Sequence, residues 1–575
     1  MLDSRLEVML MLGSLLIVAI IVAAFPRAGG ISACADERWR SKVEAVYFNG
    51  AIHTLDPAEP VVEALSVAGG RILETGSSGE ILSRVAPGVR TIDLRGRTVI
   101  PGLTDAHAHF LGYAEESTWL DLAGTSSLDE ILERVSGSLA IIASGGWIPG
   151  RGWDQNDWPD ARYPEKGALD RIAPDNPVFL VRVCGHAAFV NSAALQLAGI
   201  TRDTADPPGG KILRDARGEP SGVLVDNAIQ LVDSAVPSPT RQEKKRLLAA
   251  AARNCLSVGL VGVHEMGMTA DAVAIYQELY AAGELPFRIT GYLSADDPGN
   301  TPLLDAGPLP GRGDELFRIV GAKFYADGSL GARSAALLAD YSDEPLNRGI
   351  LMESPDELYR RVLPWREKGF QIAVHAIGDA AIREVLDVYE RLNAAHRPLD
   401  LPGRVEHAQV ISPSDIPRFA ALGVIPSMQF KHCTSDMSWA QARLGPERIA
   451  GAYAWRSLLS AGSRIPGGSD FPVEPINPFL GIHAAVTRQD TAGNPEGGWQ
   501  GAQRLTVEEA IRAFTVDAAY AGRAETVAGS LSPGKLADFV VISGDIFSMQ
   551  PLEIPKIRVL ATILGGEIVY SSEDF

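Results

Sequence analysis

The stretch RIVGAKFYADGSL, Arg318–Leu330, determines the fold assignment because it places a lysine at the end of an apolar strand pattern. An apolar run, 319–322, leads into Lys323, and Phe-Tyr-Ala-Asp-Gly follows, which is typical of a strand that runs into a loop. Lysine is rarely buried without a partner. A lysine at the end of an interior strand therefore indicates a special chemical environment at that strand end.

Similar apolar runs recur along the middle of the chain. The expected strands are 97–107, 260–266, 286–293, 318–324, 370–376, 403–410, 423–430 and 464–470. Helical patterns lie between several of them, at 271–283, 355–369, 380–396 and 446–462. Strands that alternate with helices predict an α/β fold with a parallel sheet, and this strand number is that of the (β/α)8, TIM-like barrel.

Both ends of the folded chain have short alternating runs separated by glycines and turn residues. We therefore expect residues 41–100 and 520–575 to form one composite β-domain, a β-sandwich built from both termini. The barrel is expected over 101–519. A segment of about 111–254 is too long for a crossover between the first two strands and predicts an inserted subdomain over the barrel mouth.

Residues 1–40 are interpreted as a targeting segment. Met9–Phe25 carries no charge, and its length lies between that of a signal-peptide core and that of a membrane span. Ile31–Cys34 resembles a bacterial lipobox, in which the cysteine is lipidated after cleavage, and Ala33–Ala35 also fits a cleavage site. An uncleaved anchor and a mis-assigned start codon are the alternatives. We expect an extracytoplasmic protein, periplasmic or at the cell surface, that is either secreted or tethered to the membrane.

Charge and cysteine content exclude several classes. The net charge is −19, which argues against a nucleic-acid partner and against an electrostatic hold on anionic lipid. It says nothing positive about the substrate, which we expect to be a small molecule. The four cysteines have no CxxC spacing, so neither a disulfide framework nor a cysteine-based zinc site is predicted. Cys184, Cys255 and Cys433 are expected to be buried thiols. The sequence leaves a homodimer open.

The barrel hypothesis requires catalytic residues at the carboxyl ends of the strands. The expected strands end in metal-type side chains: His107, His109, Lys323, His375, His407 and Asp470. Histidines one residue apart on a strand point to the same face, so an HxH pair can bind one ion. Neutral imidazole and carboxylate suit zinc and similar divalent ions. HxH alone is a weak signal; its repetition along the strand order strengthens the metal hypothesis.

Longer motifs contain or accompany these side chains: PGLTDAHAHF (101–110), GWDQNDWP (152–159), GHAAFVNSAAL (185–195), KFYADGSLGARSAAL (323–337), VHAIGDAA (374–381), RVEHAQ (404–409), GGSDFPVEPINPFLGIHAAVTRQD (467–490) and GSLSPGKLADFVVI (529–542). With these motifs the chain resembles the amidohydrolase superfamily, and more narrowly the amidohydrolase-3 branch that contains N-substituted formamide deformylase and the YtcJ-like proteins. One departure is Phe430, where the branch usually has proline.

The resemblance implies one or two divalent metal ions, most simply zinc. His107, His109 and Asp470 would hold one ion and His375 and His407 the other. A Lys323 carboxylated by CO2 would bridge them, because an ammonium is a cation and cannot bind metal. The alternatives are an unmodified Lys323 paired with Asp327 or Asp470, or a site for one metal.

The resemblance also implies a metal-dependent hydrolase that cleaves an amide-type C–N bond, of an N-substituted amide, a formamide or an acyl-amine, by metal-activated hydroxide. Asp470 is expected to transfer the proton, and His186 to bind substrate or stabilise the oxyanion. Trp153 and Arg333 are expected to contact substrate, and Trp147 and Trp158 are further wall candidates. The alternatives are a non-catalytic binding or regulatory protein on the same barrel, or an ester or lactone hydrolase.

Overall fold

The computed structural model describes residues 43–575 except 184, 208, 312–314 and 396–400, and in that part of the chain four sheets are present. The central sheet has eight strands, all parallel, as predicted. In spatial order they are β8 (Leu103–Ala108), β15 (Leu260–Met268), β16 (Arg288–Ser294), β17 (Phe317–Tyr325), β18 (Gln371–Ala376), β19 (Arg404–His407), β20 (Ile425–Gln429) and β21 (Gly467–Gly468).

The sheet closes on itself between β21 and β8. The Asp470 N–H donates to the His107 carbonyl oxygen at 2.8 Å, and the His109 N–H donates to the Phe471 carbonyl oxygen at 2.9 Å. A Cβ on Gly468 would lie 2.8 Å from the His107 nitrogen, so this close approach requires glycine. The closed sheet is the predicted TIM-like barrel.

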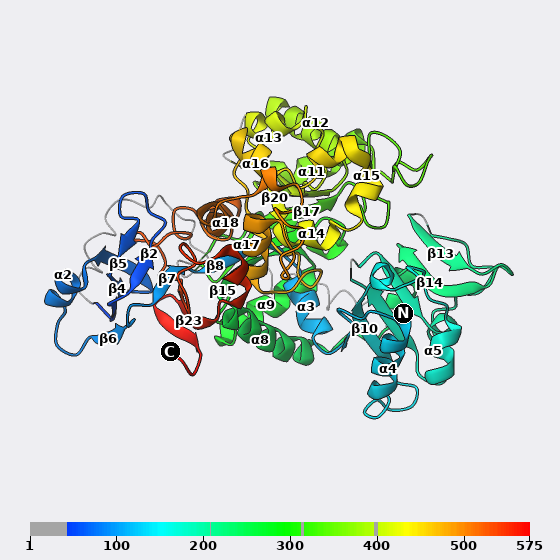
Figure 1. Ribbon diagram of the computed structural model, residues 1–575, viewed down its shortest axis with the longest axis horizontal. Helices are drawn as coiled ribbons and strands as arrows, with labels where there is room; N and C mark the ends of the chain where they lie inside the picture. The colour runs from blue at the N-terminus through cyan, green and yellow to red at the C-terminus, as the bar shows by residue number, and fades with distance from the viewer. Residues whose placement is uncertain (1–42, 184, 208, 312–314, 396–400) are drawn as a thin grey trace, which may run out of the picture.

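Helices cover the outside of the barrel. Figure 1 shows α11, α12, α13 and α16 above it and α8 and α9 below it. Helix α11 begins where Ser354 and Glu357 form a capping box and Pro355 occupies the first turn. The barrel helices are α3 (Phe110–Glu116), α8 (Arg241–Ser257), α9 (Ala270–Ala282), α10 (Thr301–Ala306), α11 (Pro355–Glu367), α12 (Asp379–Ala395), α13 (Ile416–Leu422), α14 (Phe430–Asp436), α15 (Ala440–Arg448), α16 (Trp455–Ser460), α17 (Pro478–Thr487), α18 (Val507–Ala513) and α19 (Val516–Ala521).

The helix expected over 446–462 is broken. Helix α15 ends at Arg448 and α16 begins at Trp455. Between them the Tyr453 N–H donates to the Gln409 carbonyl oxygen at 2.8 Å, and the Ile411 N–H donates to the Gly451 carbonyl oxygen at 2.9 Å. These long-range hydrogen bonds replace helical ones, so tertiary structure overrides the local helical pattern.

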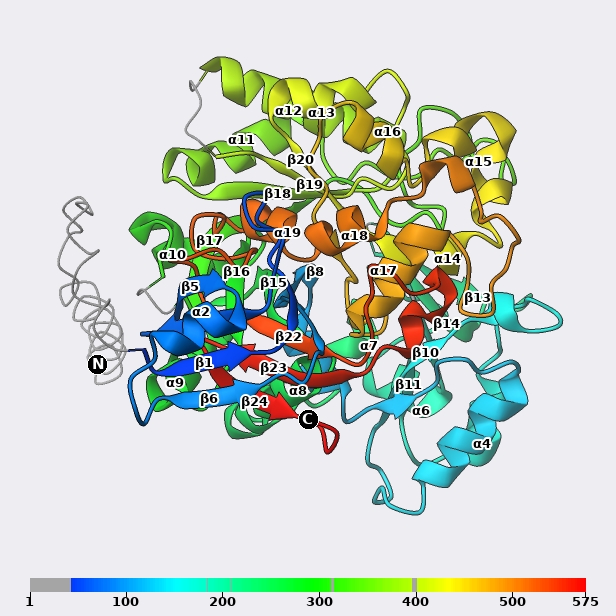
Figure 2. The ribbon, with the colours of Figure 1, turned by 60° about the vertical axis from the view of Figure 1, so that its left-hand side comes forward.

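The two ends of the described chain share one sheet. Its strands are β24 (Glu567–Ser571), β23 (Val559–Leu564), β22 (Phe539–Ile542), β7 (Thr98–Pro101), β2 (Ala51–His53) and β3 (Val61–Val62), and β22 pairs with β7. A second sheet consists of β5 (Arg71–Gly76), β4 (Ala64–Ala68), β1 (Ala45–Phe48) and β6 (Arg90–Asp93), with α2 (Ser78–Ser83). The Tyr47 and Phe539 rings pack edge to face across the sheets at 4.8 Å. This is the predicted composite of both termini, and Figure 2 brings it to the front.

The inserted segment forms a sheet of its own beside the barrel (Figure 1, right). It contains β13 (Gly210–Arg214), β14 (Pro220–Asp226), β12 (Ala187–Val190), β11 (Val178–Arg182), β10 (Ile148–Trp153) and β9 (Leu120–Asp121), with α4 (Leu128–Ser138), α5 (Gly167–Ile172), α6 (Ser192–Leu197) and α7 (Gln230–Asp233). Helix α8, although inside the expected 111–254 segment, packs Leu248, Cys255 and Leu256 into the barrel core.

Cys255 and Cys433 are buried free thiols, as expected, whereas Cys34 and Cys184 lie outside the described residues. The targeting segment 1–40 also lies outside them. Among the residues that the structure describes, no helix is long and apolar enough to cross a membrane.

Candidate metal centre and active site

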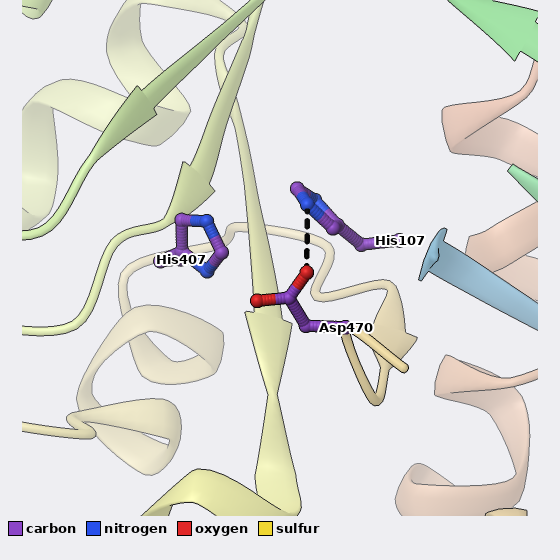
Figure 3. Close-up of side chains that lie close together, drawn as sticks. All are labelled: His107, His407 and Asp470. Atoms are coloured by element: carbon purple, nitrogen blue, oxygen red, sulfur yellow. Dashed lines mark ion pairs between the residues drawn. The ribbon is translucent and has the colours of Figure 1, made fainter. Parts of the chain in front are cut away.

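Three buried side chains meet at the carboxyl end of the barrel. His107 lies on β8, His407 ends β19, and Asp470 follows β21. Their potential ligand atoms all lie within 4.8 Å of one another, and the His107 Nε2 is 3.4 Å from the Asp470 Oδ1 (Figure 3). Residues far apart in the chain meet here because the barrel closes between β21 and β8.

The other predicted ligands surround this cluster. The His109 Nε2 lies 3.2 Å from the Asp470 Oδ1, and the Lys323 Nζ lies 3.3 Å from the His107 Nε2. The His375 ring centroid is 4.5 Å from that of His407. The structure therefore brings all the sequence-predicted ligands to one place; their metal binding stays a prediction.

Hydrogen bonds orient three of the four imidazoles alike. The Nδ1 atoms of His107, His109 and His407 lie 2.6 Å from a Glu406 oxygen, 3.1 Å from the Met266 carbonyl oxygen and 2.7 Å from the Gln429 Oε1, respectively. These oxygens only accept, so each Nδ1 carries the proton. In a neutral imidazole with the proton on Nδ1, the Nε2 carries no hydrogen and is able to bind a metal.

His375 is oriented in the opposite sense. Its Nε2 is 3.2 Å from the Gly328 carbonyl oxygen and must donate to it, which leaves the Nδ1 without a proton. The Asp327 Oδ1 lies 3.6 Å from the same Nε2. Asp327 also accepts the backbone N–H groups of Ile377 at 3.0 Å and Gly378 at 2.8 Å, which holds the loop after β18 in place.

Burial adjusts the charges at the centre. Desolvation, followed by the charge of Lys323, lowers the pKa of His107 to about 4 and that of His375 to about 3. Both imidazoles are thus neutral at pH 7, the form that binds metal. Burial also lowers the pKa of Lys323 to about 8, which makes its neutral amine accessible near neutral pH.

The surroundings of the Asp470 carboxylate fit a metal ion. The Asp470 Oδ1 is buried and accepts no hydrogen bond from any described residue. A buried carboxylate oxygen without a donor is costly unless another group satisfies it. It faces proton-free imidazole nitrogens, and imidazole together with carboxylate is the donor combination of catalytic zinc sites.

A buried ion pair between Arg404 and Glu406 orients the His107 ring. Arg404, which is fully buried, donates to Glu406 at 2.7 and 3.0 Å, to the Tyr292 hydroxyl at 2.8 Å and to the Ser427 hydroxyl at 2.9 Å. Burial alone would raise the pKa of Glu406, but the Arg404 guanidinium outweighs it and holds the pKa well below its usual range. Glu406 is therefore a fixed anion that accepts from His107.

Sequence reasoning missed Glu406 and also His432. Glu406 lies within the RVEHAQ motif, directly before His407, so its position on a strand next to the ligands was the available signal. His432 lies on α14 after β20, a strand from which no functional residue was expected. Its ring stacks on that of His407 at 6.3 Å, and its Nε2 is buried without a hydrogen-bond partner among the described residues.

The centre opens into a cavity of about 890 Å³, here called the inner cavity. Its lining includes His109, Lys323, His375, His407, His432 and Asp470 from the barrel, and His186 from the inserted segment. The His186 Nδ1 lies 2.9 Å from an Asp226 oxygen. The inserted segment thus supplies part of the active-site wall, and His186 has the position predicted for it.

Two predicted substrate contacts lie elsewhere. Trp153 is fully buried in the core of the inserted sheet, where its Nε1 donates to the Leu180 carbonyl oxygen at 2.8 Å. It does not line the inner cavity, because it points into that core; Trp147 and Trp158 also pack in cores of the inserted segment. Arg333 lines a second cavity of about 430 Å³, the outer chamber, and not the inner cavity.

Comparison with known proteins assigns the family. A model of the amidohydrolase family matches residues 90–570. The chain belongs to this amidohydrolase family. The Bacillus subtilis protein YtcJ is 35% identical over 542 residues, covering 92% of this chain and 99% of that protein. N-substituted formamide deformylase of Arthrobacter pascens is 29% identical over 543 residues, covering 92% and 98%.

Solved structures agree with this assignment. An uncharacterized metal-dependent hydrolase from Pyrococcus horikoshii has a TM-score of 0.72 and 27% identity, covering 88% of this chain and 99% of that one. A metal-dependent hydrolase from Pyrococcus furiosus has a TM-score of 0.69 and 30% identity, covering 88% and 100%. The amidohydrolase resemblance and the barrel are confirmed, and the protein is a metal-dependent hydrolase of this family.

Proposed function

We propose that this hydrolase cleaves an amide-type C–N bond in a small, non-peptide substrate. The observation that carries the proposal is the Asp470 carboxylate, 3.2 Å from the His109 Nε2 and 3.4 Å from the His107 Nε2, at the floor of an open cavity. The similarity to an N-substituted formamide deformylase supports an amide over other carbonyl compounds.

The bound metal is proposed to be zinc. His107, His109 and Asp470 would hold one ion, and His375 and His407 a second one. When bound, the metal supplies a water of lowered pKa and polarises the scissile carbonyl. The hydrogen bonds from His107 to Glu406 and from His407 to Gln429 keep the ligand nitrogens in place for it.

Lys323 is proposed to bridge the ions as a carbamate. Among the described residues it forms no ion pair, neither with Asp327 nor with Asp470, so an ordinary buried lysine–carboxylate pair does not explain it. Its neutral nitrogen would attack the carbon of CO2, forming an N–C bond, while one C=O electron pair moves to oxygen and a nitrogen proton leaves to solvent. The product is a carboxylate on a long arm, a good metal ligand.

Asp470 is proposed to move the proton. Its carboxylate would accept a proton from the attacking water and then donate it to the leaving nitrogen, so that the amine departs neutral. His186 reaches the cavity from the opposite wall and is held by Asp226 at 2.9 Å, a position suited to binding the substrate or its developing oxyanion.

We also propose that the protein is exported, and that residues 1–40 or a lipidated Cys34 tether it to the membrane. This proposal concerns where the protein acts and not the reaction. A homodimer likewise remains open.

The proposed reaction is tested by assaying zinc-loaded protein with a panel of N-formyl amines, N-acyl amino acids and simple N-substituted amides, with amine release as the readout. Hydrolysis of at least one amide class, and its loss in Asp470→Asn, is expected. Matched esters and lactones are assayed in parallel by acid release, and turnover of these alone would favour the ester hydrolase. The absence of any turnover by metal-loaded protein would favour the binding protein.

A further inference from the structure

The outer chamber adjoins the inner cavity. Arg182, His186, Gly331 and Trp439 line both, so one substrate is able to extend from the metal centre into the chamber. The walls of the chamber come from the inserted segment on one side and from the loops after β17 and around α15 on the other.

The chamber wall is cationic. Arg182, Arg333 and Arg443 line it, and no carboxylate does so among the described residues. Arg182 is paired with Asp154 at 2.5 Å. The positive charge of the wall therefore comes from Arg333 and Arg443. This is the reverse of the whole chain, whose net charge is −19. The arginines of the chamber therefore attract an anionic group, although the protein as a whole is negatively charged.

Two of these arginines share one counter-ion. Arg333 donates to Asp343 through Nε at 3.2 Å and Nη2 at 3.0 Å, and Arg443 pairs with the same carboxylate. Glu344 lies 3.4 Å from Arg333, but its side chain is 53% exposed, so solvent weakens that contact. Two guanidinium groups that share the Asp343 carboxylate, with only a half-exposed Glu344 beside them, have positive charge that is incompletely compensated.

Arg443 is the more buried of the two. It is 7% exposed, and its Nε has no hydrogen-bond partner among the described residues. Burial, followed by the charge of Arg333, lowers the pKa of Arg443. A mostly buried guanidinium that lines the chamber with a like charge beside it is stabilised by an incoming anion.

Apolar surface accompanies the charge. The Arg443 guanidinium lies 5.5 Å from the centroid of the Trp439 ring, and Tyr163 lines the same chamber. An anionic group attached to an apolar body matches this wall better than a fully solvated ion does. Arg333 also has a left-handed backbone, φ 59°, which is uncommon for a non-glycine residue and occurs often at functional sites.

We propose that the substrate is an amide that carries a carboxylate on the part remote from the scissile bond, and that Arg333 and Arg443 bind this carboxylate in the outer chamber. The proposal rests on the amide hydrolysis proposed above and adds the class of substrate. Planar guanidinium groups match carboxylates geometrically, and such charge-assisted hydrogen bonds are the strong ones.

The test uses two amides that differ only in the carboxylate: 4-(2-acetamidoethyl)benzoate, whose carboxylate lies across the ring from the amide, and N-acetyl-2-phenylethylamine. Zinc-loaded protein should hydrolyse the acid with a kcat/KM roughly tenfold to hundredfold higher. Arg333→Gln and Arg443→Gln should remove this preference through a raised KM. Arg348→Gln is the matched control. Arg348 lies on the same loop as Arg333, pairs with Asp340 at 2.7 Å and lines neither cavity.

Equal kcat/KM for the two amides in the wild type would overturn the proposal, as would a preference that survives in both variants. If neither amide is hydrolysed, the amide function fails on these probes, and calorimetric titration of both onto zinc-loaded protein decides the carboxylate proposal. Binding of the acid that weakens in Arg443→Gln and not in Arg348→Gln supports it. Absent or equal binding of the two compounds contradicts it.

Discussion

The backbone N–H of Asp470 donates a hydrogen bond of 2.8 Å to the carbonyl oxygen of His107. This bond joins the last barrel strand to the first and sets the distance between the expected proton carrier and an expected metal ligand. Asp105, beneath it, accepts the His107 N–H at 3.0 Å and the Ser469 hydroxyl at 2.7 Å. The catalytic geometry and the closure of the barrel therefore depend on the same few hydrogen bonds.

Replacement of Asp470 by asparagine separates proton transfer from metal binding. The amide side chain keeps an oxygen near His107 and His109 but cannot accept the proton. We expect kcat to fall by about 10²–10⁴-fold while the metal content is retained, measured by steady-state kinetics and elemental analysis on the same preparation. Near-normal kcat in metal-loaded Asp470→Asn would assign proton transfer to another group.

Glu406→Gln tests the support of His107. The change leaves Arg404 as a buried cation without its anion, so the free energy of unfolding should fall by about 3–5 kcal/mol. Metal affinity should fall about 10–100-fold, because the His107 ring then faces a neutral amide in place of the carboxylate that orients it. Denaturant unfolding and metal titration measure the two effects. Glu553→Gln is the control, since its ion pair with Lys556 at 3.0 Å is exposed and should contribute almost nothing.

The same pair sets a pH dependence. Glu406 has a lowered pKa in the folded protein and an ordinary value, about 4.5, in the unfolded chain. Its stabilising contribution is therefore fully present above pH 4.5 and is lost as the pH falls below it. The stability difference between wild type and Glu406→Gln should shrink in that acidic range, and a difference that grows on acidification would contradict the assignment of Glu406 as an anion.

Much of this site could be predicted from the sequence. His107, His375 and His407 stand at strand ends, and the barrel rule brings strand ends together, so their meeting follows from the order of the strands. The support of His107 was not predicted, because neighbouring strand residues point to opposite faces and the pattern therefore assigns His407, and not Glu406, to the centre. In the folded barrel Glu406 nevertheless lies 2.6 Å from the His107 ring.

The direction of a side chain and the break in a helix also could not be predicted from the sequence. Trp153 lies in a motif of the expected inserted segment, but the sequence does not say which face of β10 points to the cavity and which to the core. The helix expected over 446–462 is interrupted because Tyr453 hydrogen-bonds to Gln409, a contact that a local pattern cannot contain. Both errors arise from tertiary packing and not from the chemistry of the residues.

Carboxylation of Lys323 predicts a CO2 and pH dependence of reconstitution. Only the neutral amine reacts, and with a pKa of about 8 its fraction rises roughly tenfold between pH 7 and pH 9. Metal-free protein given zinc at equal dissolved CO2 should thus regain activity roughly tenfold faster at pH 9, when all samples are assayed at one pH. Recovery at the same rate without CO2 would indicate an unmodified lysine.

Substitution of His432 should lower catalytic efficiency, whereas substitution of His375 should lower metal content. His432 lines the inner cavity, and its Nε2 has no hydrogen-bond partner in the described part of the chain. His432→Gln should therefore lower kcat/KM about 10–100-fold, the effect of one or two lost polar contacts, with metal content unchanged. His375→Gln should lose metal instead. Loss of metal in His432→Gln would make His432 a ligand, and unchanged kinetics would make it structural.

The most direct test of a metal-dependent amide hydrolase is removal and return of the metal. Purified protein should contain one to two equivalents of zinc or a similar divalent ion, lose amide hydrolysis when a chelator removes it, and regain hydrolysis when zinc is restored. Metal-free protein that hydrolyses amides at the full rate would contradict the mechanism proposed here.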